Sequence, residues 1–546
     1  MKRRFRKIYD ISAIVFLSLI LAVIVWLSSD GHIYFSQASG YYEDAFTLKI
    51  RGGSRALKRS IYYTLDGSEP TQEDYLYDKS TPILISDATD SENRYAARTD
   101  VGVERLINAT AYNAPDYKID KCNVVRASVF DEEGNCLDSI TGIYFVGFEN
   151  KSGYEEIYTA SIVTDPDNLF DPEKGIYVEG SNESPNYTQR GAAWEREASI
   201  TIFDDRRRQI LEQECGIRIK GGVSRRLAQK SIRCYARDQY SGGNKFQTEL
   251  FYKGQLPHRI VFYAGGNDYY CKVKDPMIHQ LTEGLNFATM RFMPCALFLN
   301  GEYWGIYFLS EEYDDTFISD HYGVKKKDVV LIKSGVLKEG EYEDYEEYLE
   351  MKRFIEEEDM SFDGNYETAC QMIDIDSYID YYATQIYIQR HEDWPSANYA
   401  LWKTREDEGS EFGDGRWRWM LFDVNSGGMD SVTNDSLLEV LCGDAMFFSL
   451  YQNEEFRRQF AERILYIGKE VLNAENCSRF LEDYKKTMAV PLAESNKRFY
   501  PAVQTEDFDD YLGGLTTFFE NRYDAVWDVL VNNMGEAWLR QNGVQK

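Results

Sequence analysis

The chain has 546 residues, of which 43% are apolar and 15% aromatic. This length exceeds what one compact core supports, and the apolar content excludes a disordered chain, so we expect a multidomain protein. Its 91 acidic and 61 basic residues give a net charge of −30, which excludes a general nucleic-acid binder. Such a charge favours either a basic partner or an acidic surface that serves only solubility.

The composition also limits which residue types could bind a metal ion. The nine cysteines include no C-x-x-C pair and there are only five histidines, so a zinc site built from thiolates or imidazoles is not expected. A site for a hard cation would have to use carboxylates.

The N-terminus carries a membrane signal. An uncharged apolar run, Ile11 to Leu27, follows a basic stretch that contains Lys2, Arg3, Arg4, Arg6 and Lys7. The run is about long enough to cross a bilayer, and a basic flank stays in the cytoplasm. We therefore expect residues 1–29 to form a basic stub and a single transmembrane anchor, with the large remainder outside the cytoplasm. A cleaved signal peptide is the alternative.

Residues 32–148 contain short aromatic and β-branched runs separated by turn residues, which predict a small immunoglobulin- or fibronectin-like β-sandwich. One such run, 61–64, is followed by Asp66-Gly67 and Pro70. The string 61–71, with the closing Ile143-Tyr144-Phe145, resembles the small β-sandwich appended to chitobiases and hexosaminidases. That resemblance implies a spacer or accessory module with its own core and no catalytic residues.

The remaining chain mixes strands and helices. Strand and hairpin patterns run to about Leu309, and helical spacing follows over 339–359 and 374–389. The segment 436–546 is predicted to be helical. The fold class expected from the sequence is thus multidomain α+β, with a transmembrane helix, a β-sandwich, and a larger α+β domain that ends in helices.

The segment 391–398 follows the second predicted helix directly and reads His-Glu-Asp-Trp-Pro-Ser-Ala-Asn. Its H-x-D-x-x-x-x-N spacing is that of a kinase catalytic loop, in which the aspartate accepts the proton of the substrate hydroxyl and the asparagine ligates a metal. Asp393 and Asn398 are the corresponding residues. Alone the match is weak, because three residue types at fixed spacing recur by chance.

Two further patterns agree with this interpretation. The run 417–423 predicts a strand ending at Asp423, where an aspartate would bind the magnesium that bridges nucleotide phosphates. Upstream, the Gly221-Gly222 turn precedes a strand that begins near Lys230, and a lysine there can neutralise phosphates. An aspartate that begins a turn, and an ordinary exposed hairpin, are the structural alternatives.

Several motifs in order resemble the CotH family of atypical protein kinases, over about 155–524. They are Gly221-Gly222-Val223-Ser224-Arg225 with Lys230-Ser231, Leu299-Asn300-Gly301-Glu302-Tyr303-Trp304-Gly305-Ile306-Tyr307 leading to Glu311-Glu312, Asp393 to Asn398, and Trp419 to Asp423. The resemblance implies an atypical kinase-like domain over 155–435, completed by the helical part 436–546. It implies transfer of the ATP γ-phosphate to serine or threonine of a basic, serine-rich protein substrate, at the cell surface or in a spore coat.

The same resemblance assigns roles residue by residue. Asp393 is the catalytic base, and Asn398 and Asp423 are ligands of Mg²⁺. Lys230, with Ser224 and Arg225 at the hairpin tip, contacts the phosphates of ATP. Trp417 is a candidate for stacking on adenine, although a tryptophan on such a strand is more often a core residue.

Two other functions stay open. One is a non-catalytic spore-coat or cell-surface scaffold that keeps the fold and binds a partner. The other is a carbohydrate-active enzyme with a carboxylate pair, for which no local motif is found.

Overall fold

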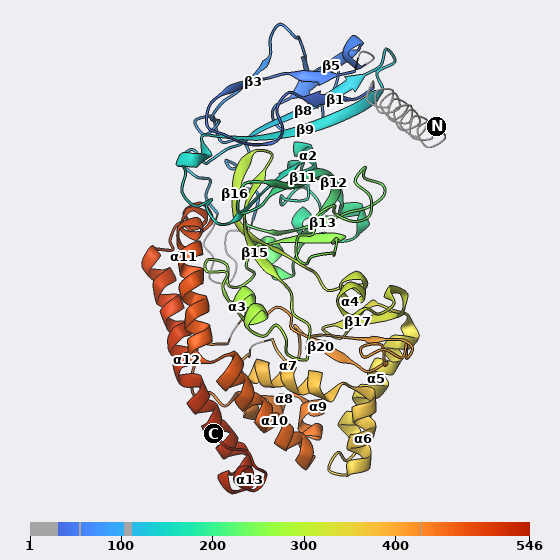
Figure 1. Cartoon of the computed structure of the whole chain (residues 1–546), viewed down its shortest axis with the longest axis vertical. Coiled ribbons are helices and arrows are strands. Elements are labelled where there is room, and N and C mark those ends of the chain that lie inside the picture. The colour runs from blue at the N-terminus through green and yellow to red at the C-terminus, as the bar shows by residue number, and fades with distance from the viewer. Residues whose placement is uncertain (1–30, 54–55, 103–111, 392, 427) are drawn as a thin grey trace, which may run out of the picture.

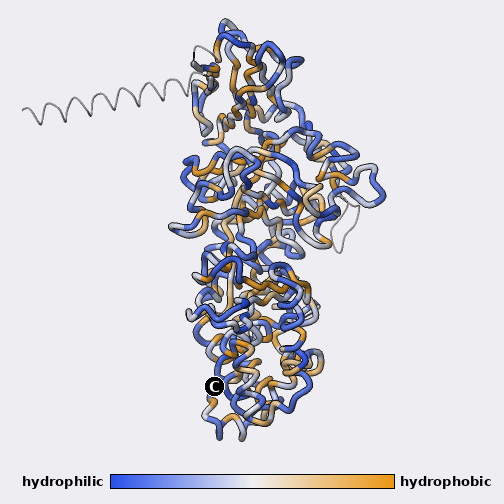
Figure 2. Tube along the Cα trace, turned by 90° about the vertical axis from the view of Figure 1, so that its right-hand side faces the viewer, coloured by the Kyte–Doolittle hydropathy of each residue, from blue (hydrophilic) through white to orange (hydrophobic). Residues whose placement is uncertain are grey.

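The computed structural model describes residues 31–53, 56–102, 112–391, 393–426 and 428–546. A β-sandwich-like region, a barrel and an α/β lobe follow one another along the long axis, and two long helices run beside the lobe toward the barrel (Figure 1). Hydrophobic stretches gather along the inside of each layer (Figure 2).

The predicted fold class is corrected on one point, the transmembrane helix. No helix of the described residues is long and apolar enough to cross a membrane. The longest, α12 (Thr505–Met534), carries charged residues along its length and buries only one face, as a helix on a protein core does. The segment predicted to span the membrane, 11–27, lies outside the described residues.

Three small sheets form the sandwich-like region. The largest has the order β2-β9-β8-β5-β6, with β2 (Gly40–Tyr42), β9 (Cys136–Val146), β8 (Asn123–Phe130), β5 (Ser60–Thr64) and β6 (Tyr75–Leu76). The others pair β1 (Ile33–Phe35) with β4 (Ile50–Gly52), and β3 (Phe46–Leu48) with β7 (Ile83–Ile85). Inward residues such as Leu48, Ile61 and Val125 form a separate buried cluster. The region therefore has a core of its own.

Part of this region is nevertheless shared with the barrel. The ring of Phe145 packs against Phe203 and Phe298 of the barrel with ring centroids 5.7 and 5.0 Å apart. The carboxylate of Glu302, which is buried, accepts hydrogen bonds from the backbone N–H groups of Arg94 (2.5 Å), Tyr95 (3.0 Å) and Ala96 (2.6 Å). The sandwich is thus docked on the barrel by an aromatic contact and a buried carboxylate.

Replacing Glu302 with glutamine should lower the midpoint of thermal unfolding, because an amide cannot accept three N–H groups as a carboxylate does. We expect a loss of about 1–3 kcal/mol in the free energy of unfolding, the usual range for a hydrogen bond to a buried charge. Urea unfolding measures it, with Glu73→Gln at an exposed position as the matched control. Equal stability of the two variants would mean that Glu302 does not dock the sandwich.

Seven strands close the barrel in the order β10-β11-β12-β13-β14-β16-β15. Their bounds are β10 (Tyr158–Val163), β11 (Arg196–Phe203), β12 (Gln209–Lys220), β13 (Ser231–Tyr235), β14 (Arg259–Tyr263), β15 (Phe292–Leu299) and β16 (Glu302–Ser310). Alternate residues such as Ile217, Ile219 and Ile232 enter one buried cluster. Because side chains alternate across a strand, Arg218 and Lys220 lie on the outer face.

The lobe contains an antiparallel sheet in the order β18-β17-β19-β20, with β18 (Val336–Glu339), β17 (Val329–Lys333), β19 (Ala400–Thr404) and β20 (Arg418–Met420). Both faces are covered: Leu331 and Trp402 belong to one buried cluster, and Leu401 and Trp419 to another. The strands are therefore apolar on both sides, as in a buried sheet.

Helices surround this sheet. They are α3 (Lys274–Leu281), α4 (Asp315–Tyr322), α5 (Tyr342–Glu357), α6 (Asp363–Met372), α7 (Ile375–Tyr387), α8 (Ser436–Gly443), α9 (Ala445–Leu450), α10 (Glu454–Tyr466), α11 (Ala474–Phe499), α12 and α13 (Glu536–Gln541), with the short α2 (Pro166–Phe170) beside the barrel. The helices predicted over 339–359 and 374–389 form as α5 and α7. In α11, Ser495 Oγ accepts a hydrogen bond from the backbone N–H of Ile306, 3.0 Å away, which ties the lobe to the barrel.

Candidate functional site

Helix α7 ends directly before the loop that carries Asp393. The helix starts at an aspartate cap, since Asp374 Oδ1 accepts from the backbone N–H of Ser377 at 3.2 Å. Its other end is held by Arg522, which is buried and donates to the carbonyl oxygens of Ile386 (3.0 Å) and Tyr387 (2.8 Å). A cation at a helix C-terminus complements the exposed carbonyl groups there. Both ends of the helix that positions Asp393 are therefore fixed.

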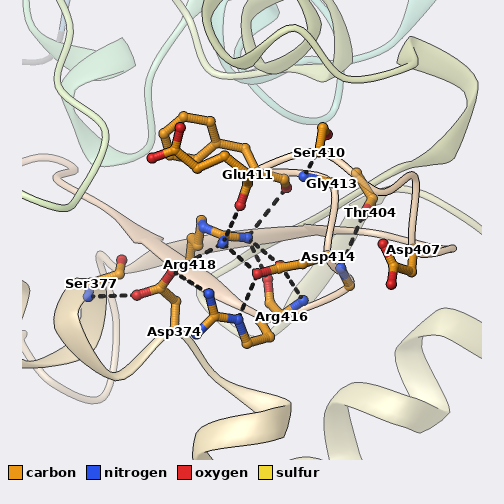
Figure 3. Close-up of polar contacts among 12 residues, drawn as sticks. Asp374, Ser377, Thr404, Asp407, Ser410, Glu411, Gly413, Asp414, Arg416 and Arg418 are labelled. Atoms are coloured by element: carbon orange, nitrogen blue, oxygen red, sulfur yellow. Dashed lines mark hydrogen bonds and ion pairs between the residues drawn. The ribbon is translucent and has the colours of Figure 1, made fainter.

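Strand β20, which leads to Asp423, is attached to the start of the same helix. Arg418 binds Asp374 at 3.0 Å and Asp414 at 2.8 Å, as Figure 3 shows. Burial opposes ionisation of Asp414, but hydrogen bonds from Arg418 and Arg416 outweigh it and lower the pKa of Asp414 to about 2. These ion pairs hold β20 on α7, so the two site aspartates emerge from one connected unit.

Both carboxylate oxygens of Asp393 have partners. Oδ1 accepts from Arg390 Nη2 at 2.7 Å, and Oδ2 accepts from the amide nitrogen Nδ2 of Asn398 at 2.5 Å. The backbone N–H of Asn398 donates to Ser334 Oγ at 3.0 Å. Since Nδ2 of Asn398 faces Asp393, its amide oxygen is the atom left for a cation.

Asp423 lies in a short polar turn after β20. Asn425 Nδ2 donates to Asp423 Oδ1 and, at 2.8 Å, to Asp275 Oδ2 of α3. Asp275 Oδ1 in turn accepts the backbone N–H of Val424 at 2.8 Å. Burial raises the pKa of Asp423 to about 6, the charge of Asp275 adds to the rise, and Arg390 opposes it. The turn therefore presents a carboxylate for which a bound cation would be favourable.

The backbone at both predicted metal ligands is unusual. Asn398 has φ of 52° and Asp423 has φ of 56°, in the left-handed region. Asparagine and aspartate tolerate this region better than most residues, yet such conformations cluster at functional sites because the surrounding structure must impose them. The two positions thus share an unfavourable backbone conformation.

Two lysines, Lys220 from the barrel and Lys333 from the lobe, lie near Glu312. Lys220 ends β12, and its charge interacts with both Glu312 and Asp423, although burial is the larger effect and lowers the pKa of Lys220. Burial also lowers the pKa of Lys333, at the end of β17, to about 8. Glu312, ion-paired with Arg233, keeps a pKa of about 2 because that arginine and the two lysines outweigh its burial. Lys220, Lys333 and Glu312 thus form one charged group, and Lys220 links it to Asp423.

Lys230 is not brought to the aspartates. It lies directly before β13, where its Nζ donates to Leu227 O and lies over the rings of Tyr187 and Tyr177, 4.1 and 5.3 Å from their centroids. It is completely buried, and burial lowers its pKa. The predicted phosphate contact therefore lies apart from the aspartates, and Lys220, on the outer face of the neighbouring strand β12, is the lysine whose charge interacts with that of Asp423.

Ser224 and Arg225 lie in the short helix η5 (Val223–Arg226) after the glycine turn. Arg225 is buried and donates to backbone oxygens of Gly221 (2.8 Å) and Gln189 (2.7 Å), and burial lowers its pKa to about 10. Its guanidinium is therefore used to hold the turn, and no described contact joins it or Ser224 to Asp393 or Asp423.

Trp417 is a core residue, the alternative that the sequence left open. Its side chain is 2% exposed and packs edge-to-face on Tyr348, with centroids 5.7 Å apart. A cavity of about 420 Å³ lies next to this pair, against the loop that carries Asp393. The lining includes Tyr348, Tyr399, Leu401, Trp419, Pro395 and Ser396. The aromatic surface near the site thus comes from Tyr348 and Trp419.

No local sequence pattern pointed to Asp275, Asn425, Arg390 or Lys333 as site residues. Asp275 and Asn425 are joined only in the fold, and neither has a motif around it. Lys220 had a usable signal, because the alternation of Ile217 and Ile219 with Arg218 places it outside the barrel.

Comparisons with known proteins agree with this geometry. The family model described as CotH kinase protein matches residues 217–526, more than half of the chain, and includes every residue of the site described above. A second model, described as Fn3 associated, matches residues 46–144 in the sandwich-like region. No curated protein matches the chain.

Proposed function

Because the chain belongs to the CotH kinase family, we propose that it is a magnesium-dependent atypical protein kinase that transfers the γ-phosphate of ATP to a serine or threonine hydroxyl. The observation that carries the proposal is the group formed by Asp393, Asn398 and Asp423. The loop after α7 carries Asp393, whose carboxylate has two hydrogen-bond partners, and Asn398. The end of β20, which is attached to the same helix, carries Asp423. Asn398 and Asp423 supply two oxygen atoms suited to a metal. This is the set of groups that phosphoryl transfer requires.

The donors fit a hard cation. The amide oxygen of Asn398 and the carboxylate of Asp423 are oxygen ligands, which Mg²⁺ prefers, and it commonly completes its shell with water and phosphate oxygens. A bound Mg²⁺ would neutralise phosphate charge. It would also stabilise the ionised form of Asp423, which burial and the charge of Asp275 disfavour. Asn425 and Asp275 hold the turn in which Asp423 lies.

The chain's own groups supply positioning and charge. Asp393 Oδ2 accepts the proton of the acceptor hydroxyl as its oxygen bonds to the γ-phosphorus, and the bond from that phosphorus to the bridging oxygen breaks to release ADP. Lys220, from the barrel, would face the phosphates beside Asp423, and Lys333, from the lobe, would add a second positive charge next to it; these charges would stabilise the leaving group. The purine base occupies the cavity beside Tyr348 and Trp419, since aromatic surfaces stack on bases.

Two finer assignments belong to the same proposal. The net charge of −30 supports a basic, serine-rich protein substrate. The sandwich-like region is proposed to be a spacer module of the chitobiase type, supported by the absence of any candidate catalytic residue among its described residues.

Binding of magnesium and ATP should weaken as the pH falls below about 6, where protons compete for Asp423. A ligand that must lose a proton loses affinity about tenfold for each pH unit below its pKa. Calorimetry with Mg²⁺ and a non-hydrolysable ATP analogue at pH 5.0 and 7.5 measures the change. Because the nucleotide also titrates, Asp423→Asn is the matched control, and its residual binding should follow the nucleotide alone. Identical pH profiles for both proteins would exclude Asp423 as a ligand.

A further inference from the structure

Arg390 is a buried arginine with few partners at the centre of the site. Its side chain is 2% exposed, and among the described residues its side-chain hydrogen bond joins Nη2 to Asp393 Oδ1 at 2.7 Å. The other two nitrogens, Nε and Nη1, are buried and have no hydrogen-bond partner among the described residues. Its charge also acts on Asp423, whose pKa it lowers against the effect of burial. The guanidinium is therefore held at the carboxylate of Asp393, and its charge also acts on Asp423.

We infer that Arg390 is a positioning residue of the transfer site: it holds the Asp393 carboxylate by Oδ1 so that Oδ2 faces the acceptor hydroxyl. This inference rests on the proposed function. Asp393 would otherwise be held by Asn398 alone, through the oxygen that must receive the proton.

The cost of this arginine argues against a role in stability. A buried guanidinium with two unpaired donors forfeits hydrogen bonds to water without replacing them, at about 1–3 kcal/mol for each unsatisfied group. Buried charges are usually retained for stability only when their hydrogen bonds are complete. An unsatisfied buried group in a native site calls for a functional explanation.

Two other buried arginines show the contrast. Arg522 donates from all three nitrogens to oxygens around the end of α7, and none of these oxygens belongs to a carboxylate. Arg498 also has two unpaired nitrogens, but its guanidinium lies over the rings of Trp304 and Phe499, 4.1 and 4.7 Å from their centroids. Those rings stabilise a cation. Among the described residues, Arg390 has neither hydrogen bonds from all three nitrogens nor an aromatic ring against its guanidinium. Its described partner is the proposed base, Asp393.

The position also suits phosphoryl transfer. A carboxylate that is held by one oxygen keeps the other in a fixed direction, and small displacements of a reacting group lower turnover strongly. Orientation of the nucleophile contributes more than proton abstraction in a loose transition state, so a fixed direction of the Asp393 carboxylate is what such a reaction needs.

The test compares Arg390→Met with Arg498→Met in the full chain. Each substitution removes a buried guanidinium and keeps a side chain of similar length, and Arg498 lies outside the proposed site, over Trp304 and Phe499. For Arg390→Met we expect kcat to fall about tenfold or more with KM for ATP nearly unchanged, since positioning of the base is lost and nucleotide binding is kept. The unfolding midpoint should stay equal or rise. Arg498→Met should show the opposite pattern, with a lower midpoint, because its contacts with the rings are lost, and an unchanged kcat per folded molecule.

The assay follows transfer of phosphate from ATP to protamine or to the protein itself. Arg390→Lys should restore part of the activity. Guanidinium ion added to Arg390→Ala is a second rescue experiment. Rescue of kcat without a change in the midpoint supports positioning. The inference is overturned if Arg390→Met keeps kcat within twofold, or if it loses activity only in proportion to its loss of folded protein. A folded wild type that transfers no phosphate at all contradicts the proposed function first, and the role of Arg390 falls with it.

Discussion

Asp393→Asn should lower turnover about 100-fold or more while the protein still binds magnesium and ATP, because the carboxylate acts chiefly in the transition state. Asparagine keeps the shape of the side chain and can still accept from Arg390, so the loop should remain folded. It cannot receive the hydroxyl proton at Oδ2. Single-turnover kinetics measures the loss, and calorimetry measures the nucleotide affinity.

The matched control is Asp528→Asn, an exposed aspartate on α12. It should keep turnover within about twofold, since exposed carboxylates away from a site contribute little. If Asp393→Asn and Asp528→Asn have the same activity, Asp393 is not the base, and the scaffold function gains support.

Asp423→Asn should instead lose magnesium-dependent binding of ATP, by about 100-fold or more, because a charged ligand of the ion becomes neutral. Turnover falls as a consequence. The two aspartate variants are thereby distinguishable, since one loses binding and the other loses the chemical step.

The same substitution has an opposite effect on stability. The pKa of Asp423 in the fold, about 6, lies above its usual value of 3.8, so ionisation opposes folding, and this penalty grows as the pH rises from about 4 to 6 and is complete above 6. Asp423→Asn removes the penalty, so without metal its unfolding midpoint at pH 7.5 should rise above that of the wild type. A variant that is both less stable and inactive would indicate a structural role for Asp423.

The H-x-D-x-x-x-x-N spacing was enough to propose the loop from the sequence, and the run 417–423 was enough to propose the strand before Asp423. Asp393 and Asn398 lie five positions apart in one loop, so a motif could register both. The helix before them was predictable from its apolar spacing and forms as α7. Asp423 followed because a strand that ends in aspartate is a local pattern.

The residues proposed to lie near the phosphates could be chosen only from the fold. Lys230 and Lys220 lie on neighbouring strands, and only their place in the barrel decides that one is buried against Tyr177 and Tyr187 while the other faces Asp423. Asp275 reaches the Asp423 turn from a helix nearly 150 positions earlier in the chain, a contact that local patterns do not encode.

The predicted transmembrane helix shows another limit. Its evidence was the hydropathy of residues 11–27, and the long helices that the structure does describe are amphipathic because they cover the barrel and the lobe. In these long helices the apolar residues lie on the face that is buried against the protein.

The central claim is transfer of the terminal phosphate of ATP, and one labelling experiment tests it most directly. The full chain is incubated with Mg²⁺, protamine as a basic serine-containing acceptor, and ATP labelled either on the γ- or on the α-phosphate. We predict label on protamine or on the protein itself from γ-labelled ATP only, and its disappearance in Asp393→Asn. Label from α-labelled ATP would show nucleotide transfer in place of phosphoryl transfer, and no label from either, in a protein that binds magnesium and ATP, would contradict kinase activity.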